Sequence, residues 1–113
     1  MSAELSENTR NALLSLASAL KKHYGNHAPR MLIYGSWARG KAQAASDIDV
    51  LLLFSSRVSP GLEIRRISKD LADINIQYGA LISILPVYEL DFLENTGPFW
   101  KNVKQEAVTL ESI

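Results

Sequence analysis

The length, composition and charge of the chain limit what it can be. Its 113 residues are enough for one domain with a single core, and the balance of 12 basic and 12 acidic residues argues against nucleic-acid binding by broad electrostatic attraction. The lack of cysteine excludes disulfides, thiolate metal ligands and a cysteine nucleophile, and two histidines, His23 and His27, disfavour a multi-histidine zinc site.

The first half of the chain predicts one helix followed by two strands. Residues 6–24 show an amphipathic helical pattern that ends in basic residues and Gly25. The apolar positions of this helix are Leu13, Leu16, Leu20 and Tyr24. Apolar runs at 31–34 and 47–54 predict buried strands, with a short helix starting near Trp37 between them and a turn-rich loop at 55–61.

The second half predicts a further helix, a third strand and a helical tail. Residues 64–78 form a helical pattern that stops at Gly79, and 80–87 read as a strand. The predicted core face of this helix is Ile64, Ile67, Leu71, Ile74 and Tyr78. A short helix at 89–93, a break at 95–98 and a last helix at 99–106 follow. We expect one small α/β (α+β) domain over residues 1–113, with a three- or four-stranded sheet.

No signal-peptide pattern opens the chain, and no apolar run is long enough to span a bilayer. A cytoplasmic protein is therefore the default expectation.

A pair of aspartates marks the start of the second strand. Asp47 and Asp49 are two residues apart, so their side chains are expected to point to the same face of the strand. Two carboxylates held together are costly unless a cation lies between them. Mg²⁺ prefers hard oxygen ligands and carries nucleotide phosphates, so the pair indicates a site for a magnesium–nucleotide complex.

A glycine-serine turn precedes this pair by ten residues, 37–46. Gly35 lets phosphate oxygens approach the backbone, and Ser36 adds a hydroxyl donor at the expected start of a helix. Arg39 lies about one helical turn after Ser36, where its guanidinium could bind terminal phosphates in a bidentate way. Taken together, the two halves of the motif predict that Ser36 meets the triphosphate while Asp47 and Asp49 hold the metal.

These residues resemble the signature of the DNA polymerase β-type nucleotidyltransferase superfamily. The longer string Gly35-Ser36-x-Ala38-Arg39-Gly40, followed by Ser46-Asp47-x-Asp49, is similar to its minimal branch, the MNT proteins, which are single domains of about this length. Residues 99–108 resemble the short closing helix of that branch. The resemblance covers roughly residues 10–110.

The resemblance implies a polymerase β-type fold, a mixed sheet flanked by helices, and a specific chemistry. A nucleoside monophosphate, expected to be AMP from ATP, would pass to an acceptor hydroxyl with release of pyrophosphate. The implied catalytic and Mg²⁺-binding residues are Asp47 and Asp49, and the implied nucleotide-binding residues are Gly35, Ser36 and Arg39.

The resemblance also suggests a partner. Many minimal members resemble antitoxins paired with a helical HEPN ribonuclease, and some of those are thought to silence it by adding AMP to a tyrosine. The expected partners are an NTP and a HEPN-type toxin, without membrane or nucleic acid. Whether the chain forms homo- or hetero-oligomers stays open.

One segment departs from the family pattern. Active members present a third carboxylate from a later strand, where it binds metal and helps to deprotonate the acceptor. The corresponding segment, 80–87, contains no Asp or Glu, and Ser83 stands about where the acid is expected; Asp73 and Glu89 lie before and after the strand.

The alternative hypothesis is therefore a catalytically weak or inactive nucleotide-binding antitoxin that neutralises its partner by binding alone. An enzyme that modifies an antibiotic is a third hypothesis, with no recognisable substrate segment.

Several residues also have a purely structural interpretation. Ser36 alone would be a helix cap, the two aspartates a strand start, and Arg39 a surface cation. Phe99 and Trp100 follow a Gly-Pro break, where two large rings usually pack the tail onto the core. If these rings are exposed, a partner surface is the better interpretation.

Overall fold

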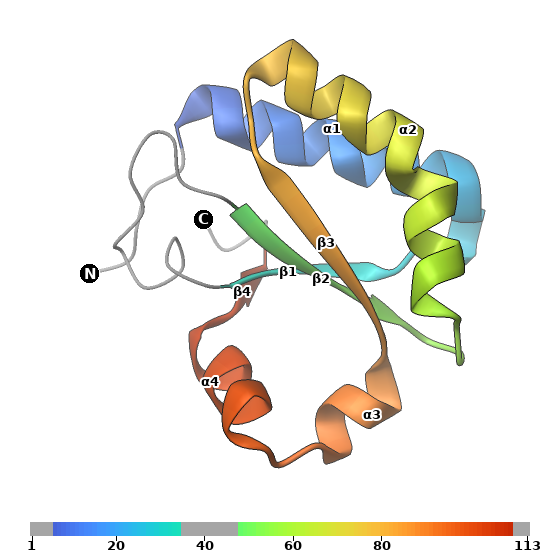
Figure 1. Cartoon of the computed structure of the whole chain (residues 1–113), viewed down its shortest axis with the longest axis vertical. Helices are drawn as coiled ribbons and strands as arrows, with labels where there is room; N and C mark the ends of the chain where they lie inside the picture. Colours follow the sequence, from blue (N-terminus) through green and yellow to red (C-terminus); the bar gives the residue numbers. More distant parts are fainter. Residues whose placement is uncertain (1–5, 35–47, 110–113) are drawn as a thin grey trace.

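A four-stranded sheet with helices on both faces forms the framework of the protein (Figure 1). The computed structural model describes residues 6–34 and 48–109. In chain order, its elements are α1 (Glu7–Tyr24), the 3-10 turn η1 (Gly25–His27), β1 (Arg30–Tyr34), β2 (Ile48–Phe54), α2 (Pro60–Tyr78), β3 (Ile82–Tyr88), α3 (Glu89–Glu94), α4 (Pro98–Glu106) and β4 (Val108–Thr109).

The sheet is mixed, with the strand order β3-β2-β1-β4. β1 runs antiparallel to β2 and to β4, whereas β2 and β3 are parallel. Parallel neighbours need a crossover connection, and α2 supplies it. The predicted mixed sheet flanked by helices is confirmed; β4 has only two residues, too few to show a strand pattern in the sequence.

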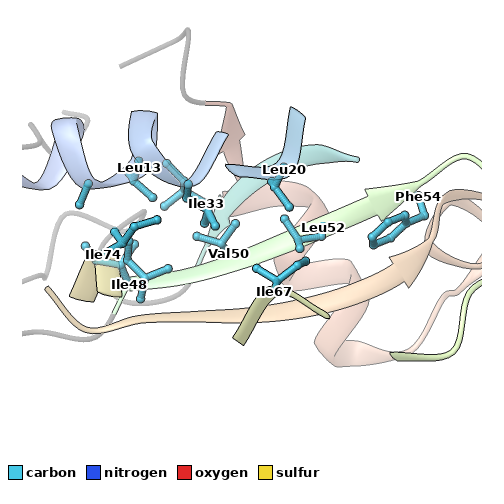
Figure 2. Close-up of a cluster of buried hydrophobic side chains, with 12 residues drawn as sticks. Leu13, Leu20, Ile33, Ile48, Val50, Leu52, Phe54, Ile67 and Ile74 are labelled. Atoms are coloured by element: carbon cyan, nitrogen blue, oxygen red, sulfur yellow. The ribbon is translucent and has the colours of Figure 1, made fainter. Parts of the chain in front are cut away.

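The first face of the sheet packs against α1 and α2 (Figures 1 and 2). Alternate residues of the strands point to this face, because side chains along a strand alternate in direction. The buried residues on this side include Leu13, Leu16, Leu20, Ile33, Val50, Leu52, Phe54, Ile67 and Ile74. The predicted helical face of α1 is confirmed at the three leucines.

The predicted core face of α2 is wrong at one position. Ile64 is 39% exposed, while the neighbouring Glu63 is only 6% exposed. A carboxylate can be buried there because the Tyr24 hydroxyl donates a hydrogen bond of 2.6 Å to Glu63 Oε1. The helix also begins at Pro60, inside the predicted loop, since proline suits the first helical turn.

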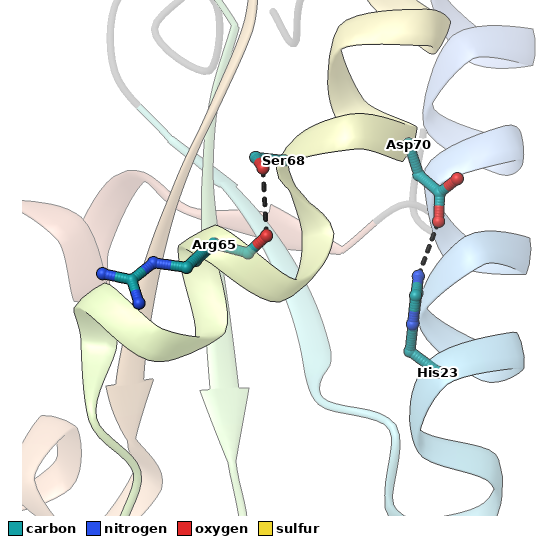
Figure 3. Close-up of polar contacts among 4 residues, drawn as sticks. All are labelled: His23, Arg65, Ser68 and Asp70. Carbon is teal, nitrogen blue, oxygen red and sulfur yellow. Dashed lines mark hydrogen bonds and ion pairs between the residues drawn. The ribbon is translucent and has the colours of Figure 1, made fainter.

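Polar contacts hold α1 and align it with α2. Ser6 caps α1 by accepting a hydrogen bond from the Thr9 backbone N–H, and Gly25 ends the helix with a positive φ of 59°. His23 Nε2 lies 2.6 Å from Asp70 Oδ2 across the two helices, as Figure 3 shows. This contact assigns His23 a structural role.

The second face of the sheet carries a smaller core formed with α3 and α4. Its buried residues are Leu32, Leu51, Leu53, Phe92 and Val103. Trp100 packs against this cluster and lies edge-on to Phe92, with ring centroids 6.0 Å apart. The expected packing of the tail onto the core is therefore confirmed for Trp100, whereas Phe99 is 50% exposed.

Within the described ranges, no helix is long and apolar enough to cross a bilayer.

Candidate functional site

Most of the predicted site lies outside the described residues. Gly35, Ser36, Arg39 and Asp47 belong to this group, as does the helix expected near Trp37. Asp49 is described, and so are the strands that lead into and out of the motif. The described part of the site is therefore built around Asp49.

Asp49 is the polar break in an otherwise buried central strand. Every other residue of β2 is buried, and Asp49 is only partly so. It shares a face of the strand with Leu51 and Leu53, the face that packs on α3 and α4. A carboxylate here is held by rigid backbone on both sides, because β2 pairs with both β1 and β3.

The two strands on either side of the motif, β1 and β2, are antiparallel neighbours in the sheet. Tyr34, the last residue of β1, pairs directly with Asp49 near the start of β2. The described residues on either side of the motif segment, Tyr34 and Ile48, therefore lie at the same end of this strand pair.

Tyr34 is an aromatic neighbour of the acid. Burial first, and then the negative charge of Asp49, raise the pKa of the Tyr34 hydroxyl above its ordinary value. The ring of Tyr34 lies edge-on to Phe99, with centroids 6.1 Å apart. The side of the site facing α4 is thus aromatic. Sequence reasoning gave neither ring this position. An antiparallel pairing of the two predicted strands that flank the motif would have placed Tyr34 beside Asp49.

Ser83 occupies the place next to Asp49 on the other side. The parallel register pairs Asp49 with Ser83, and the serine is exposed on the same face. β3 contains no acid, so the described strand does not supply a third carboxylate. Glu89 is bound to Arg30 at 2.8 Å, at the opposite end of β1 from Tyr34, and Asp73 is on α2, which packs on the other face.

The donor set suits a hard cation. Asp49 offers carboxylate oxygens and Ser83 a hydroxyl beside them, the ligand type that Mg²⁺ prefers. Among the described residues, no three histidine or acidic side chains gather as metal ligands. Asp47, the second metal ligand that the sequence predicts, lies outside the described residues.

Comparison with known families decides the classification. The profile of the polymerase beta nucleotidyltransferase family matches residues 13–108. The chain belongs to the polymerase β nucleotidyltransferase family. The match runs from within α1 to the first residue of β4, so it includes β1, β2 and β3 around Asp49 as well as the motif. No curated protein matches this nucleotidyltransferase significantly in sequence.

Two solved structures share the fold of this nucleotidyltransferase. A toxin–antitoxin structure with AMP-PNP has a TM-score of 0.57 and 14% identity, over 89% of this chain and 71% of the other. A protein assigned provisionally as a minimal nucleotidyltransferase has a TM-score of 0.51 and 21% identity, over 88% of this chain and 93% of the other. At these identities the likeness establishes the fold.

Proposed function

We propose that this protein is a Mg²⁺-dependent nucleotidyltransferase that moves AMP from ATP to a hydroxyl group of a partner protein. The observation that carries the proposal is the position of Asp49. It is the one partly exposed polar residue of the central strand, and it is paired with Tyr34 where the motif segment joins the sheet. Family membership supplies the reaction class.

Each motif residue has a role in this proposal. Asp47 and Asp49 hold the metal, which when bound neutralises phosphate charge and stabilises the attacking and leaving oxygens of an in-line displacement. The Gly35 backbone and the Ser36 hydroxyl bind phosphate oxygens, and Arg39 binds the terminal phosphates that leave as pyrophosphate. The backbone of Asp49 is fixed by pairing on both sides of its strand, so its carboxylate would be available to hold the metal without a change of the strand.

The proposed partner is a HEPN-type toxin, which this protein would neutralise as a cytoplasmic antitoxin. The structural likeness to a toxin–antitoxin protein with AMP-PNP supports both the nucleotide and the setting. The half-exposed ring of Phe99 beside Tyr34 gives the acceptor an apolar surface next to Asp49.

A second candidate function is neutralisation by binding alone. The pairing of Asp49 with Ser83 favours it, because a serine stands where an acid would help to deprotonate the acceptor. In that case the protein still binds Mg-ATP but transfers nothing. Transfer requires Asp47 and Asp49 for catalysis, whereas neutralisation by binding alone requires them at most to hold Mg-ATP.

The test of transfer uses α-phosphate-labelled ATP, Mg²⁺ and a lysate of the source cells. Wild type is expected to label a macromolecule, and Asp49→Asn to reduce the label at least 100-fold. Asp73→Asn is the matched control, because Asp73 is an exposed acid on α2, on the other side of the sheet. Full labelling by a folded Asp49→Asn variant would contradict the metal role.

Toxin neutralisation separates the two candidates. If an Asp47→Asn, Asp49→Asn double variant still protects cells from the toxin, binding alone is sufficient. Loss of protection with retained toxin binding supports transfer.

A further inference from the structure

One cavity lies away from the proposed nucleotide site. It has a volume of about 540 Å³, within the usual range of small-ligand pockets. Its wall includes Pro86, Val87 and Tyr88 at the end of β3 that leads into α3 (Figure 1). Pro86, the lining residue of β3 that is nearest to Ser83 in sequence, is three positions from this partner of Asp49, which is about 10 Å along a strand at 3.3 Å per residue. The cavity is therefore a separate site.

A cation already occupies part of this cavity. The guanidinium carbon of Arg57 lies 5.0 Å from the centre of the Tyr88 ring, and Arg57 Nη1 is 3.8 Å from Asp91 Oδ2. The Arg57 side chain is nevertheless 78% exposed. An exposed ion pair of this length is held weakly. The cavity wall therefore already binds a guanidinium, and the Arg57 side chain that carries it is held weakly.

Other residues of the cavity wall could bind a further positive charge. Glu94, one turn after Asp91 on α3, also lines the cavity and has no cationic partner among the described residues. Trp100 adds a second aromatic wall. The nearby Lys104 is occupied elsewhere, since its ammonium donates to the backbone oxygens of Leu93 and Asn95. With two carboxylates against one arginine, the lining favours a cation over an anion.

We propose that this cavity binds a guanidinium group from outside the molecule, with Arg57 as the internal occupant that the ligand displaces. The ligand cation would lie over Tyr88 beside Asp91 and Glu94, and its apolar part would contact Trp100. The guanidinium belongs either to a small molecule or to an exposed arginine of a protein. The proposal does not depend on nucleotidyl transfer.

The test is an NMR titration of the full chain that follows the indole N–H signal of Trp100. Argininamide represents the small-molecule source, and a blocked Gly-Arg-Gly peptide represents a protein arginine. Citrullinamide is the matched control ligand, because a urea replaces the guanidinium at nearly the same shape. Saturable shifts with the arginine ligands and at least tenfold weaker binding of citrullinamide are expected.

Variants of the cavity wall test whether the arginine ligands bind at this cavity. Arg57→Ala is expected to bind argininamide severalfold more tightly than wild type, because the competing internal guanidinium is gone. Asp91→Asn with Glu94→Gln is expected to bind it at least tenfold more weakly. Tighter binding of the peptide would indicate a protein source, and tighter binding of argininamide a small molecule. No saturable shift in either wild type or Arg57→Ala, or an equal response to citrullinamide, would overturn the proposal.

Discussion

Asp49 on β2 lies directly opposite Ser83 on β3, in the parallel pair of the sheet. The serine is exposed on the face that also carries Asp49, so a side chain at position 83 lies beside that of the aspartate. The pairing therefore identifies position 83 as the place where a third carboxylate would lie beside Asp49. A single substitution of Ser83 can test the effect of such a carboxylate.

Ser83→Asp is expected to strengthen the response to Mg²⁺. Without metal, two carboxylates side by side on neighbouring strands repel, so the variant should melt at a lower temperature than wild type. Mg²⁺ binds the folded state and should raise the melting temperature of the variant more than that of wild type. Thermal melts with and without Mg²⁺ measure both effects, and a transfer assay shows whether the added acid raises the rate. The control is Ser83→Asn, which has the same shape without the charge; equal Mg²⁺ responses of the two variants would contradict the placement.

The alkaline titration of Tyr34 should depend on Asp49. Its pKa is raised above the ordinary value of about 10, by burial and then by the Asp49 charge, so the folded state favours the neutral hydroxyl. The resulting stability is fully present below pH 10 and is lost as pH rises through the raised pKa. In Asp49→Asn the pKa of Tyr34 should fall but stay above 10, because burial remains.

NMR titration of the Tyr34 ring carbons between pH 9 and 12 measures this change, with Tyr34→Phe to assign the signal. Asp73→Asn should leave the pKa of Tyr34 unchanged. An unchanged pKa in Asp49→Asn would show that the two side chains do not interact.

The buried Glu63 should make Tyr24 energetically important. The Tyr24 hydroxyl donates to Glu63 Oε1 at 2.6 Å, and Arg66 Nη1 is farther away, at 3.6 Å. Tyr24→Phe keeps the ring beside Phe54 but removes the donor, so urea unfolding should show a loss of about 1–3 kcal/mol. In a Glu63→Gln background the charge is absent, and the same substitution should cost at least about 1 kcal/mol less. Equal costs in both backgrounds would refute the coupling.

Asn75 should anchor the start of β3, the strand that carries Ser83. Its side-chain oxygen accepts from the Ile82 backbone N–H at 3.0 Å, and its amide donates to the Ile82 carbonyl at 3.2 Å. Asn75→Ala leaves both partly buried backbone groups without this partner, so a loss of about 1–3 kcal/mol and faster hydrogen exchange at Ile82 are expected. The matched control, Asn102→Ala on the exposed face of α4, should change stability by less than about 0.5 kcal/mol.

The sequence by itself determined the main helices and strands and the family, and it predicts the chemistry of the motif. The spacing of leucines predicted α1, because it follows the helical period of 3.6 residues, and the continuous apolar run with a polar break at Asp49 predicted β2 as a buried strand. The motif residues indicated the family that the profile match confirms. The site residues Gly35, Ser36, Arg39 and Asp47 remain predictions.

Only the tertiary structure decided which distant residues meet. The pairing of Asp49 with Tyr34 and Ser83, the burial of Glu63 under Tyr24, and the cavity between Arg57 and Trp100 join segments far apart in the chain. Such contacts depend on strand register and on the packing of helices across the sheet, and a shift of one residue would turn each strand side chain to the other face. Periodicity within an element carries no information about register between elements.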